Sequence, residues 1–230
     1  NYYFYEVRYR LATNNYSTAY NDSLGIEKLQ KYASLFGLNE RTGIEIEEAA
    51  PQIANEFPVM AAIGQSNNNY TTVQLARYVT AVANEGTVYQ YTLLNRLEDS
   101  DGNVLQTFEP QVRNQIDVLD TEEWNAIHSG MRMVVENTKE FDGFPIEAAG
   151  KTGTAQQNLK RPNHALFVGY APYDDPEISI ATRIAYGYTS HNAAKLARNV
   201  FAYYFNVENE DELLNGQAAN GNSSSNEISD

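Results

Sequence analysis

Three apolar segments lie close together between residues 146 and 186 and are separated by turn-forming stretches. They cover residues 146–154, 164–171 and 178–186, and Asp174-Asp175-Pro176 stands between the last two. Short apolar runs bounded by turn residues are typical of β-strands. Strands joined by short turns pair in antiparallel fashion. These segments therefore predict an antiparallel sheet near the carboxyl end of the chain.

Helical periodicity dominates the rest of the sequence. Apolar residues recur at helical spacing in four segments, which cover residues 26–36, 71–86, 120–135 and 192–204. Residues 2–7 are expected to be helical as well, although their aromatic side chains would also suit a strand. Helices with a late antiparallel sheet indicate the α+β class, with the sheet flanked by helices.

Capping residues mark the ends of several of these helices. Thr71 with Gln74 resembles a capping box, and Asp120 with Glu123 has the same spacing. Asn192 is the expected cap of the last helix. Upstream of the sheet, residues 93–97 and 104–108 flank Asp101-Gly102 and predict a β-hairpin.

The charge of the chain excludes several partners. The 230 residues carry a formal net charge of -14. Such a chain repels nucleic acid phosphates and anionic membrane surfaces. No apolar run is as long as the stretches that typically span a membrane, so no direct membrane insertion is expected. There are no cysteines, which excludes disulfides and thiolate chemistry.

The carboxyl end of the chain differs in composition from the rest. Residues 206–230 contain acidic and small polar side chains but no Lys or Arg. A segment of this kind cannot bury enough apolar area to offset its conformational entropy. We therefore expect one folded domain over residues 1–205, followed by an acidic, polar tail over residues 206–230.

Residues 149–156 contain the main candidate functional residues of the chain. They read Ala-Gly-Lys-Thr-Gly-Thr-Ala-Gln and lie on the first predicted strand of the late sheet. Lys151 would place an ammonium group beside a nucleophile. The hydroxyls of Thr152 and Thr154 can bind a substrate carboxylate, and the N–H of Thr154 could stabilise an oxyanion. Gly153 leaves room for an extended peptide along the strand. The tripeptide alone is weak evidence, because three residues recur by chance.

The surrounding sequence adds specificity. A Lys-Thr-Gly segment occurs with Ser-x-x-Lys and Ser-Asp-Asn in penicillin-binding proteins and β-lactamases. The segments 32–44, 62–86 and 164–172 resemble, in order and spacing, the stretches that surround this motif in class B penicillin-binding proteins. The resemblance covers residues 1 to about 205. It implies the β-lactamase/transpeptidase-like fold, incomplete at the N-terminus.

The first residues bear on the catalytic centre. In this family a Ser-x-Asn triplet precedes a helix that often begins Tyr-Tyr-Phe. The chain begins Asn-Tyr-Tyr-Phe, so Asn1 matches the Asn of that triplet and its Ser is absent. No Ser-x-x-Lys sequence occurs anywhere in the chain. The resemblance therefore implies a fragment that lacks the nucleophile and is inactive alone.

The family resemblance also implies a function and partners. A serine D,D-transpeptidase is acylated by the D-Ala-D-Ala end of a peptidoglycan stem peptide, and a second stem peptide then takes up the acyl group. β-Lactams acylate the same serine. Lys151 and Asn1 would be the catalytic residues of the fragment, whereas Thr152, Gly153, Thr154, Gln156 and His164 would bind substrate. No cofactor and no metal is implied.

The expected setting follows from the same resemblance. The intact protein would lie on the extracytoplasmic face of the bacterial cell membrane, anchored by an N-terminal helix absent from this sequence. The missing N-terminal part of the same domain would be its partner. Two other functions stay open: a β-lactam sensor or non-catalytic scaffold of the same fold, and a carbohydrate-binding module. Aromatic residues at positions 2–9 could form a sugar-stacking surface, although core packing or an interface is the favoured interpretation.

Other constellations have weaker support. His128, His164 or His191 could in principle join a Ser-His-Asp triad, but no Gly-x-Ser-x-Gly segment supports one. Residues 99–103 hint at a calcium loop, yet the spacing favours a hairpin turn. Three scattered histidines without cysteine give no zinc-binding pattern.

Overall fold

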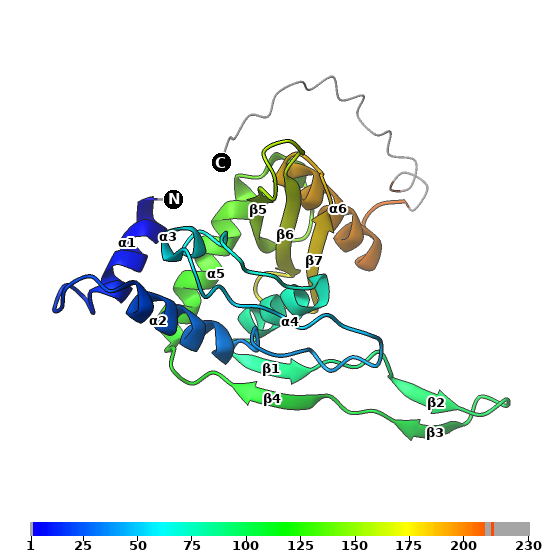
Figure 1. The fold of residues 1–230 in the computed structure, drawn as a ribbon. Coiled ribbons are helices and arrows are strands. Elements are labelled where there is room, and N and C mark those ends of the chain that lie inside the picture. Colours follow the sequence, from blue (N-terminus) through cyan, green and yellow to red (C-terminus); the bar gives the residue numbers. More distant parts are fainter. Residues whose placement is uncertain (1, 210–212, 214–230) are drawn as a thin grey trace. The chain divides into compact units, whose positions relative to one another are not determined.

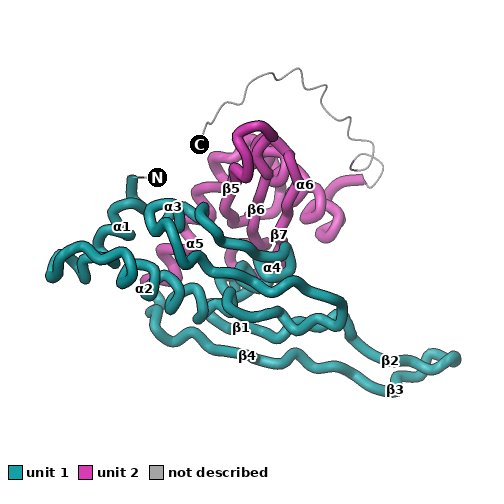
Figure 2. The backbone as a smooth tube through the Cα atoms, viewed as in Figure 1, with its two compact units in different colours: residues 1–121 teal, residues 122–230 magenta. Residues whose placement is uncertain are grey.

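The computed structural model describes residues 2–209 and 213 (Figure 1). The chain divides into two compact units, unit 1 with residues 1–121 and unit 2 with residues 122–230 (Figure 2). Among the described residues, no helix is both long enough and apolar enough to cross a membrane.

Four helices form the first part of unit 1. They are α1 (Tyr2–Ala12), α2 (Asp22–Leu35), α3 (Pro58–Ala61) and α4 (Thr72–Ala83); α1, α2 and α4 confirm the helices predicted before residue 86, and the short α3 was not predicted. The side chain of Asn21 caps α2 by accepting a hydrogen bond from the Leu24 N–H. At α4 both bonds of the predicted capping box are present, between Thr71 and Gln74. Each cap satisfies backbone donors that the first helical turn leaves free.

A buried arginine fastens α4 to the segment that follows α2. Arg77 is 1% exposed. Its guanidinium donates to the backbone carbonyls of Gly37, Glu40 and Arg41. Gly37 has a φ of +75°, and a Cβ there would stand 2.7 Å from Nη2 of Arg77. Glycine at this position therefore serves both the left-handed turn and the close approach of the arginine.

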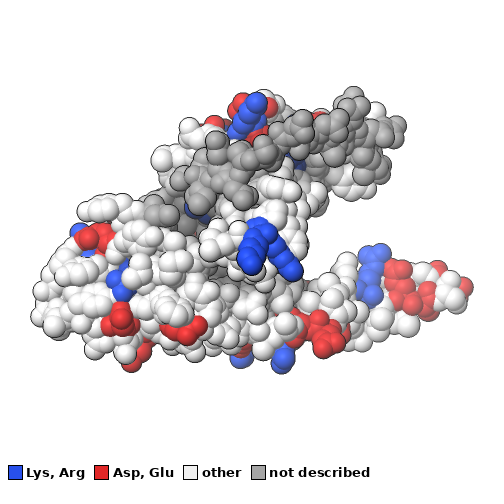
Figure 3. Space-filling model, turned by 45° about the horizontal axis from the view of Figure 1, so that its top comes forward, with Lys and Arg blue, Asp and Glu red and all other residues white. Residues whose placement is uncertain are grey.

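Unit 1 ends in two antiparallel strand pairs. β2 (Arg96–Glu98) pairs with β3 (Val104–Thr107), which confirms the predicted hairpin at Asp101-Gly102 with shorter strands. β1 (Thr87–Gln90), which precedes the hairpin in the chain, pairs with β4 (Gln111–Gln115), which follows it. The sequence did not predict β1 and β4, because their residues are mostly polar and the pair joins segments on either side of the whole hairpin. Acidic side chains gather over the β2–β3 hairpin (Figure 3).

Unit 2 contains the predicted sheet. Its elements are α5 (Thr121–Glu136, whose first residue belongs to unit 1), a 3-10 helix η1 (Lys139–Phe141), β5 (Ala149–Ala155), β6 (His164–Ala171), β7 (Ile178–Ile184) and α6 (Ser190–Tyr204). The strands are antiparallel in the order β5-β6-β7, and α6 contacts all three. The predicted α+β class and the antiparallel sheet with flanking helices are confirmed.

The core of unit 2 lies between the sheet and α6. Phe167 of β6 is fully buried there with Phe201 and the alanines of α6. Gly150 and Gly169 are paired across β5 and β6, and a Cβ on either would stand within 2.8 Å of the Phe167 ring. The two glycines therefore make room for the ring against the sheet, which is why no larger residue fits.

The last helix has a different cap from the one predicted. The last helix begins two residues before Asn192, and Thr189 caps it instead, accepting a hydrogen bond from the His191 N–H. Asn192 donates to the carbonyl of Gly187. The prediction of Asn192 as cap was wrong, because Thr189 is the residue with extended backbone before the first turn. Most of the predicted tail lies outside the described residues.

Candidate active site

The four residues of the Lys-Thr-Gly-Thr segment lie on β5, at the margin of the sheet. Among the described strands β5 pairs with β6 alone. Its other edge therefore presents backbone N–H and C=O groups that no described strand pairs with. Residues 151–155 are exposed or half-buried, in contrast to Ala149 and Gly150 at the start of the strand. An edge of this kind can accept a further extended chain.

Strand register assigns the side chains of the segment to two faces. Lys151 is opposite Val168, and Gly153 is opposite Leu166 and, one strand further, Arg183. Directly opposed residues share a face, and successive residues alternate. Lys151 and Gly153 therefore lie on the face away from α6. Thr152 and Thr154 are opposite the core residues Phe167 and Ala165, so they lie on the α6 side.

The ammonium group of Lys151 stays close to the strand edge. The side chain is exposed, and Nζ donates a hydrogen bond of 2.7 Å to the carbonyl of Thr152. The segment thus places a cation beside its own backbone edge. A cation there can stabilise negative charge on a neighbouring nucleophile or substrate.

Gly153 differs from the other glycines of the sheet. A Cβ at Gly153 would meet only the Leu166 Cβ at 3.5 Å, which is an ordinary contact. At Gly150 a Cβ would stand 2.3 Å from the Phe167 ring. Packing within the protein therefore requires glycine at position 150 but not at position 153. The missing side chain at Gly153 leaves space outside the protein core.

His164 begins β6, opposite Ala155, and its ring is held by protein groups. The side chain is only 7% exposed. Its Nδ1 accepts the Tyr186 N–H at 3.1 Å, and its Nε2 lies 3.1 Å from Oε1 of Gln157. Burial, together with the neighbouring Arg183 guanidinium, lowers the pKa of His164 below its usual value of 6.5. The ring is therefore neutral at pH 7.

The remaining predicted site residues are Gln156 and Asn1. Gln156 directly follows β5 and is exposed. Asn1 lies outside the described residues, so its predicted catalytic role stays a prediction. Within unit 2, β5 and the start of β6 bring Lys151, Thr152, Gly153, Thr154 and His164 into one sheet.

The rival constellations have local explanations. His191 contacts Glu140 at 2.8 Å, and the His128 ring lies edge-on to that of Tyr170. Each histidine of unit 2 thus has a different described partner. Asp99 accepts hydrogen bonds from the N–H groups of Asp101 and Asn103, which confirms the hairpin turn predicted at residues 99–103.

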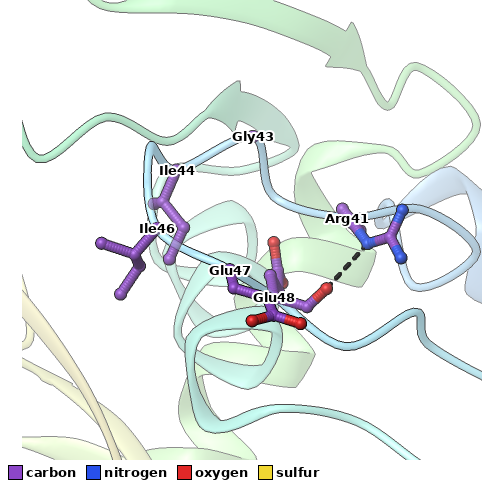
Figure 4. Close-up of a pocket in the computed structure, with 6 residues that line it drawn as sticks. All are labelled: Arg41, Gly43, Ile44, Ile46, Glu47 and Glu48. Atoms are coloured by element: carbon purple, nitrogen blue, oxygen red, sulfur yellow. Dashed lines mark hydrogen bonds between the residues drawn. The ribbon is translucent and has the colours of Figure 1, made fainter.

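A separate pocket lies in the loop after α2 and has a volume of about 310 Å³. Figure 4 shows the residues that line it, which are Arg41, Gly43, Ile44, Ile46, Glu47 and Glu48. Glu48 accepts hydrogen bonds from the N–H and hydroxyl of Thr42, and the carbonyl of Glu48 accepts one from Arg41. These contacts hold the loop together, and none of the predicted site residues lines this pocket.

Comparison with known proteins identifies the fold and the family. The family model described as the penicillin binding protein transpeptidase domain matches residues 3–202. The chain belongs to this family. Peptidoglycan D,D-transpeptidase MrdA of Haemophilus influenzae is 33% identical over 83% of the chain and 34% of its own length. The chain spans about a third of the length of the curated relatives it matches.

Solved structures agree in fold. Penicillin-binding protein 2B of Streptococcus pneumoniae superposes with a TM-score of 0.75 at 23% identity, over 89% of this chain and 38% of that one. Penicillin-binding protein A of M. tuberculosis, solved as an imipenem acyl-enzyme complex, superposes with a TM-score of 0.70 at 22% identity, over 79% of this chain and 42% of that one. The predicted assignment to class B penicillin-binding proteins is confirmed, and the match falls on the latter part of their transpeptidase domains.

Three neighbours of His164 were not predicted from the sequence. One of them, Gln157, lies in the connection between β5 and β6. Arg183 lies on β7, and Tyr186 lies in the connection between β7 and α6. Gln157 is separated from the other two by the whole of β6 and most of β7, so no local pattern links it to them. Only the pairing of β6 with β5 and β7 brings them together.

Proposed function

We propose that this chain supplies the substrate-binding wall of a peptidoglycan D,D-transpeptidase, and that the acylated serine comes from a part of the protein outside residues 1–230. The single observation that supports this most is a Lys-Thr-Gly-Thr segment on a strand whose outer edge pairs with no described strand, in a member of the transpeptidase domain family. An extended stem peptide ending in D-Ala-D-Ala would add to the free edge of β5.

Each residue of the segment has a role in this proposal. The Lys151 ammonium would favour deprotonation of the serine. The Thr152 carbonyl, which Lys151 reaches, would lie on the free edge, and the alternation of a strand would then direct the backbone of Thr154 to the same edge. The Thr154 N–H would stabilise the oxyanion of the tetrahedral intermediate. Gly153 would leave room for the peptide, and the threonine hydroxyls and Gln156 would bind its terminal carboxylate.

The acyl transfer itself would run in two steps. The serine oxygen would attack the carbonyl carbon between the two terminal D-alanines, and the bond to the last D-alanine would break with its amine taking up a proton. The amine of a second stem peptide would then attack the acyl-enzyme ester, restoring the serine and forming the crosslink. β-Lactams would acylate the same serine when their amide ring opens. The intact protein would act on the extracytoplasmic face of the bacterial cell membrane.

A chimera tests this proposal. The chain replaces the matching segment of the Haemophilus influenzae relative, which contributes the residues before it, and a fluorescent penicillin is added. We expect covalent labelling of the chimera and none of the present chain alone, both measured by intact-protein mass spectrometry. A stable adduct on the chain alone would contradict the origin of the serine outside it.

A matched pair of lysine variants tests the role of the segment. Lys151→Ala is expected to slow acylation of the chimera roughly 100-fold or more, as for loss of a group that assists proton transfer. Lys195→Ala removes the same charge from an exposed position of α6 and is expected to leave the rate unchanged. Equal rates for the Lys151→Ala and unaltered chimeras would refute the proposed role of the segment.

A further inference from the structure

The hydrogen bonds of His164 define which ring nitrogen carries the proton. The backbone N–H of Tyr186 is a donor and points at Nδ1 from 3.1 Å, so Nδ1 has no proton in this arrangement. A neutral imidazole then carries its proton on Nε2. That N–H donates to Oε1 of Gln157 at 3.1 Å. One ring therefore uses both nitrogens to join two separate segments.

These two segments are connections at the same end of the sheet, where β5 and β7 end and β6 begins. Gln157 belongs to the connection between β5 and β6, and Tyr186 belongs to the connection between β7 and α6. A second contact joins the same two segments, because Arg161 donates from Nη1 to the Tyr186 hydroxyl at 2.7 Å. The His164 and Tyr186 rings lie with centroids 5.0 Å apart. The backbone adds a third contact, from the Tyr188 N–H to the carbonyl of Asn163 at 3.1 Å.

The His164 ring lies at the end of the strand edge on which the peptide is proposed to bind. His164 is opposite Ala155, the last residue of β5, and Gln157 follows two residues later. We propose that His164 is a positioning residue for ligand binding: its ring fixes the residue after Gln156 and thereby sets the end of the β5 edge on which the peptide would lie. This inference rests on the proposed function, because it assumes that β5 is the ligand edge.

The charges around the His164 ring make its hydrogen bond with the Tyr186 N–H sensitive to pH. Nη2 of Arg183, on β7, lies 3.4 Å from Nε2; both groups carry hydrogen, so the two do not bond and the guanidinium opposes a charge on the ring. Arg161 is a second cation nearby, over the Tyr186 ring at 5.5 Å. The described contacts of the ring include no carboxylate. A proton on Nδ1 would face the donor N–H of Tyr186, so protonation of His164 would break that contact and release the ring from the connection between β7 and α6.

Hydrogen exchange on the intact chain tests whether His164 fixes the connection. In His164→Ala and in Gln157→Leu, protection factors of the backbone amides of residues 157–161 and 163 are expected to fall roughly fivefold or more, as for one lost hydrogen bond. Gln157 is exposed, so Gln157→Leu gives a readout even if His164→Ala does not fold. Leu159→Ala, at a side chain that is 84% exposed, is the matched control and should leave them unchanged. Unaltered protection in Gln157→Leu would overturn the inference.

Acylation of the chimera tests whether the fixed connection matters to the ligand. Gln157→Leu and His164→Ala are expected to slow labelling by the fluorescent penicillin roughly tenfold, as small displacements of binding groups do. As the pH is lowered, the unaltered chimera should lose rate in parallel with protonation of the His164 ring, followed by NMR. In His164→Asn, whose amide oxygen can replace Nδ1 as acceptor for the Tyr186 N–H, this part of the pH profile should disappear.

The outcomes separate the two proposals. A loosened connection with an unchanged acylation rate overturns the positioning role and leaves the proposed function intact. A pH profile that is the same in His164→Asn also overturns the positioning role. No labelling of the unaltered chimera refutes the proposed function, and the positioning role fails with it, whatever hydrogen exchange shows for the connection.

Discussion

Single residues in the sheet of unit 2 have environments that set their charge state or limit their size. His164 is kept neutral by burial and by a guanidinium, whereas Gly150 and Gly153 occupy the same strand with very different space around them. These are differences of environment, not of residue type, so each can be tested by a small substitution.

The depressed pKa of His164 predicts how stability changes with pH. Because the unfolded chain binds a proton near pH 6.5 and the folded chain binds it at a lower pH, the folded state is favoured most above pH 6.5. This stabilisation should be lost as the pH falls through the folded pKa, with a slope of at most about 1.4 kcal/mol per pH unit for one proton. Urea unfolding of the intact chain between pH 7.5 and pH 5 should show the loss, and His164→Asn should show less of it. Parallel curves for both proteins would contradict the prediction.

The two glycines of β5 predict opposite responses to alanine. Gly150→Ala forces a methyl group against the Phe167 ring and the Val168 carbonyl, and should lower the free energy of unfolding by about 1–3 kcal/mol. Gly153→Ala meets only an ordinary contact, so stability should stay the same or rise by up to about 1 kcal/mol. Urea denaturation of the two variants measures both effects. Comparable destabilisation by the two substitutions would show that position 153 is also constrained by packing.

At the scale of elements, the strand pairs of the two units contrast in burial. All residues of β2 and β3 are exposed, whereas β6 is mostly buried between β5 and β7. Two-stranded hairpins without a packed face are marginally stable in water. The aliphatic side chains of the β2–β3 hairpin are exposed, so the described residues give this hairpin no packed face.

Native-state hydrogen exchange should therefore separate these elements. Amides of β2 and β3 are expected to exchange through local opening, and amides of β6 only through the largest unfolding events. Protection of the hairpin equal to that of β6 would contradict this expectation. The measurement should be repeated at a lower protein concentration, because self-association could also protect the hairpin.

At the scale of the molecule, the division into two compact units predicts the form of the unfolding curve. Trp124 is the only tryptophan, lies in unit 2 and is 3% exposed. Its fluorescence therefore reports on unit 2, while far-ultraviolet circular dichroism reports on the helices of both units. Two-unit chains commonly depart from two-state unfolding, so we expect different transition midpoints for the two signals. Coincident curves would show that the units unfold together.

The sequence by itself determined the five longer helices, the three late strands and the Lys-Thr-Gly-Thr segment. Their signals are local: periodicity in residues 26–36, the capping box at Thr71 and Gln74, and turn residues between apolar runs. Capping, periodicity and turns act over short stretches of chain, so they can be read before the chain folds. The family resemblance rested on the same short segments in order.

Only the tertiary structure decided which residues share a face and which lie on an edge. That β5 has one described neighbour, that Lys151 and Gly153 face away from α6, and that Gln157, Tyr186 and Arg183 meet at His164 all follow from strand register. The pairing of β1 with β4 arises in the same way. Register is set by the combined packing of residues far apart in the chain, and no local pattern contains that information.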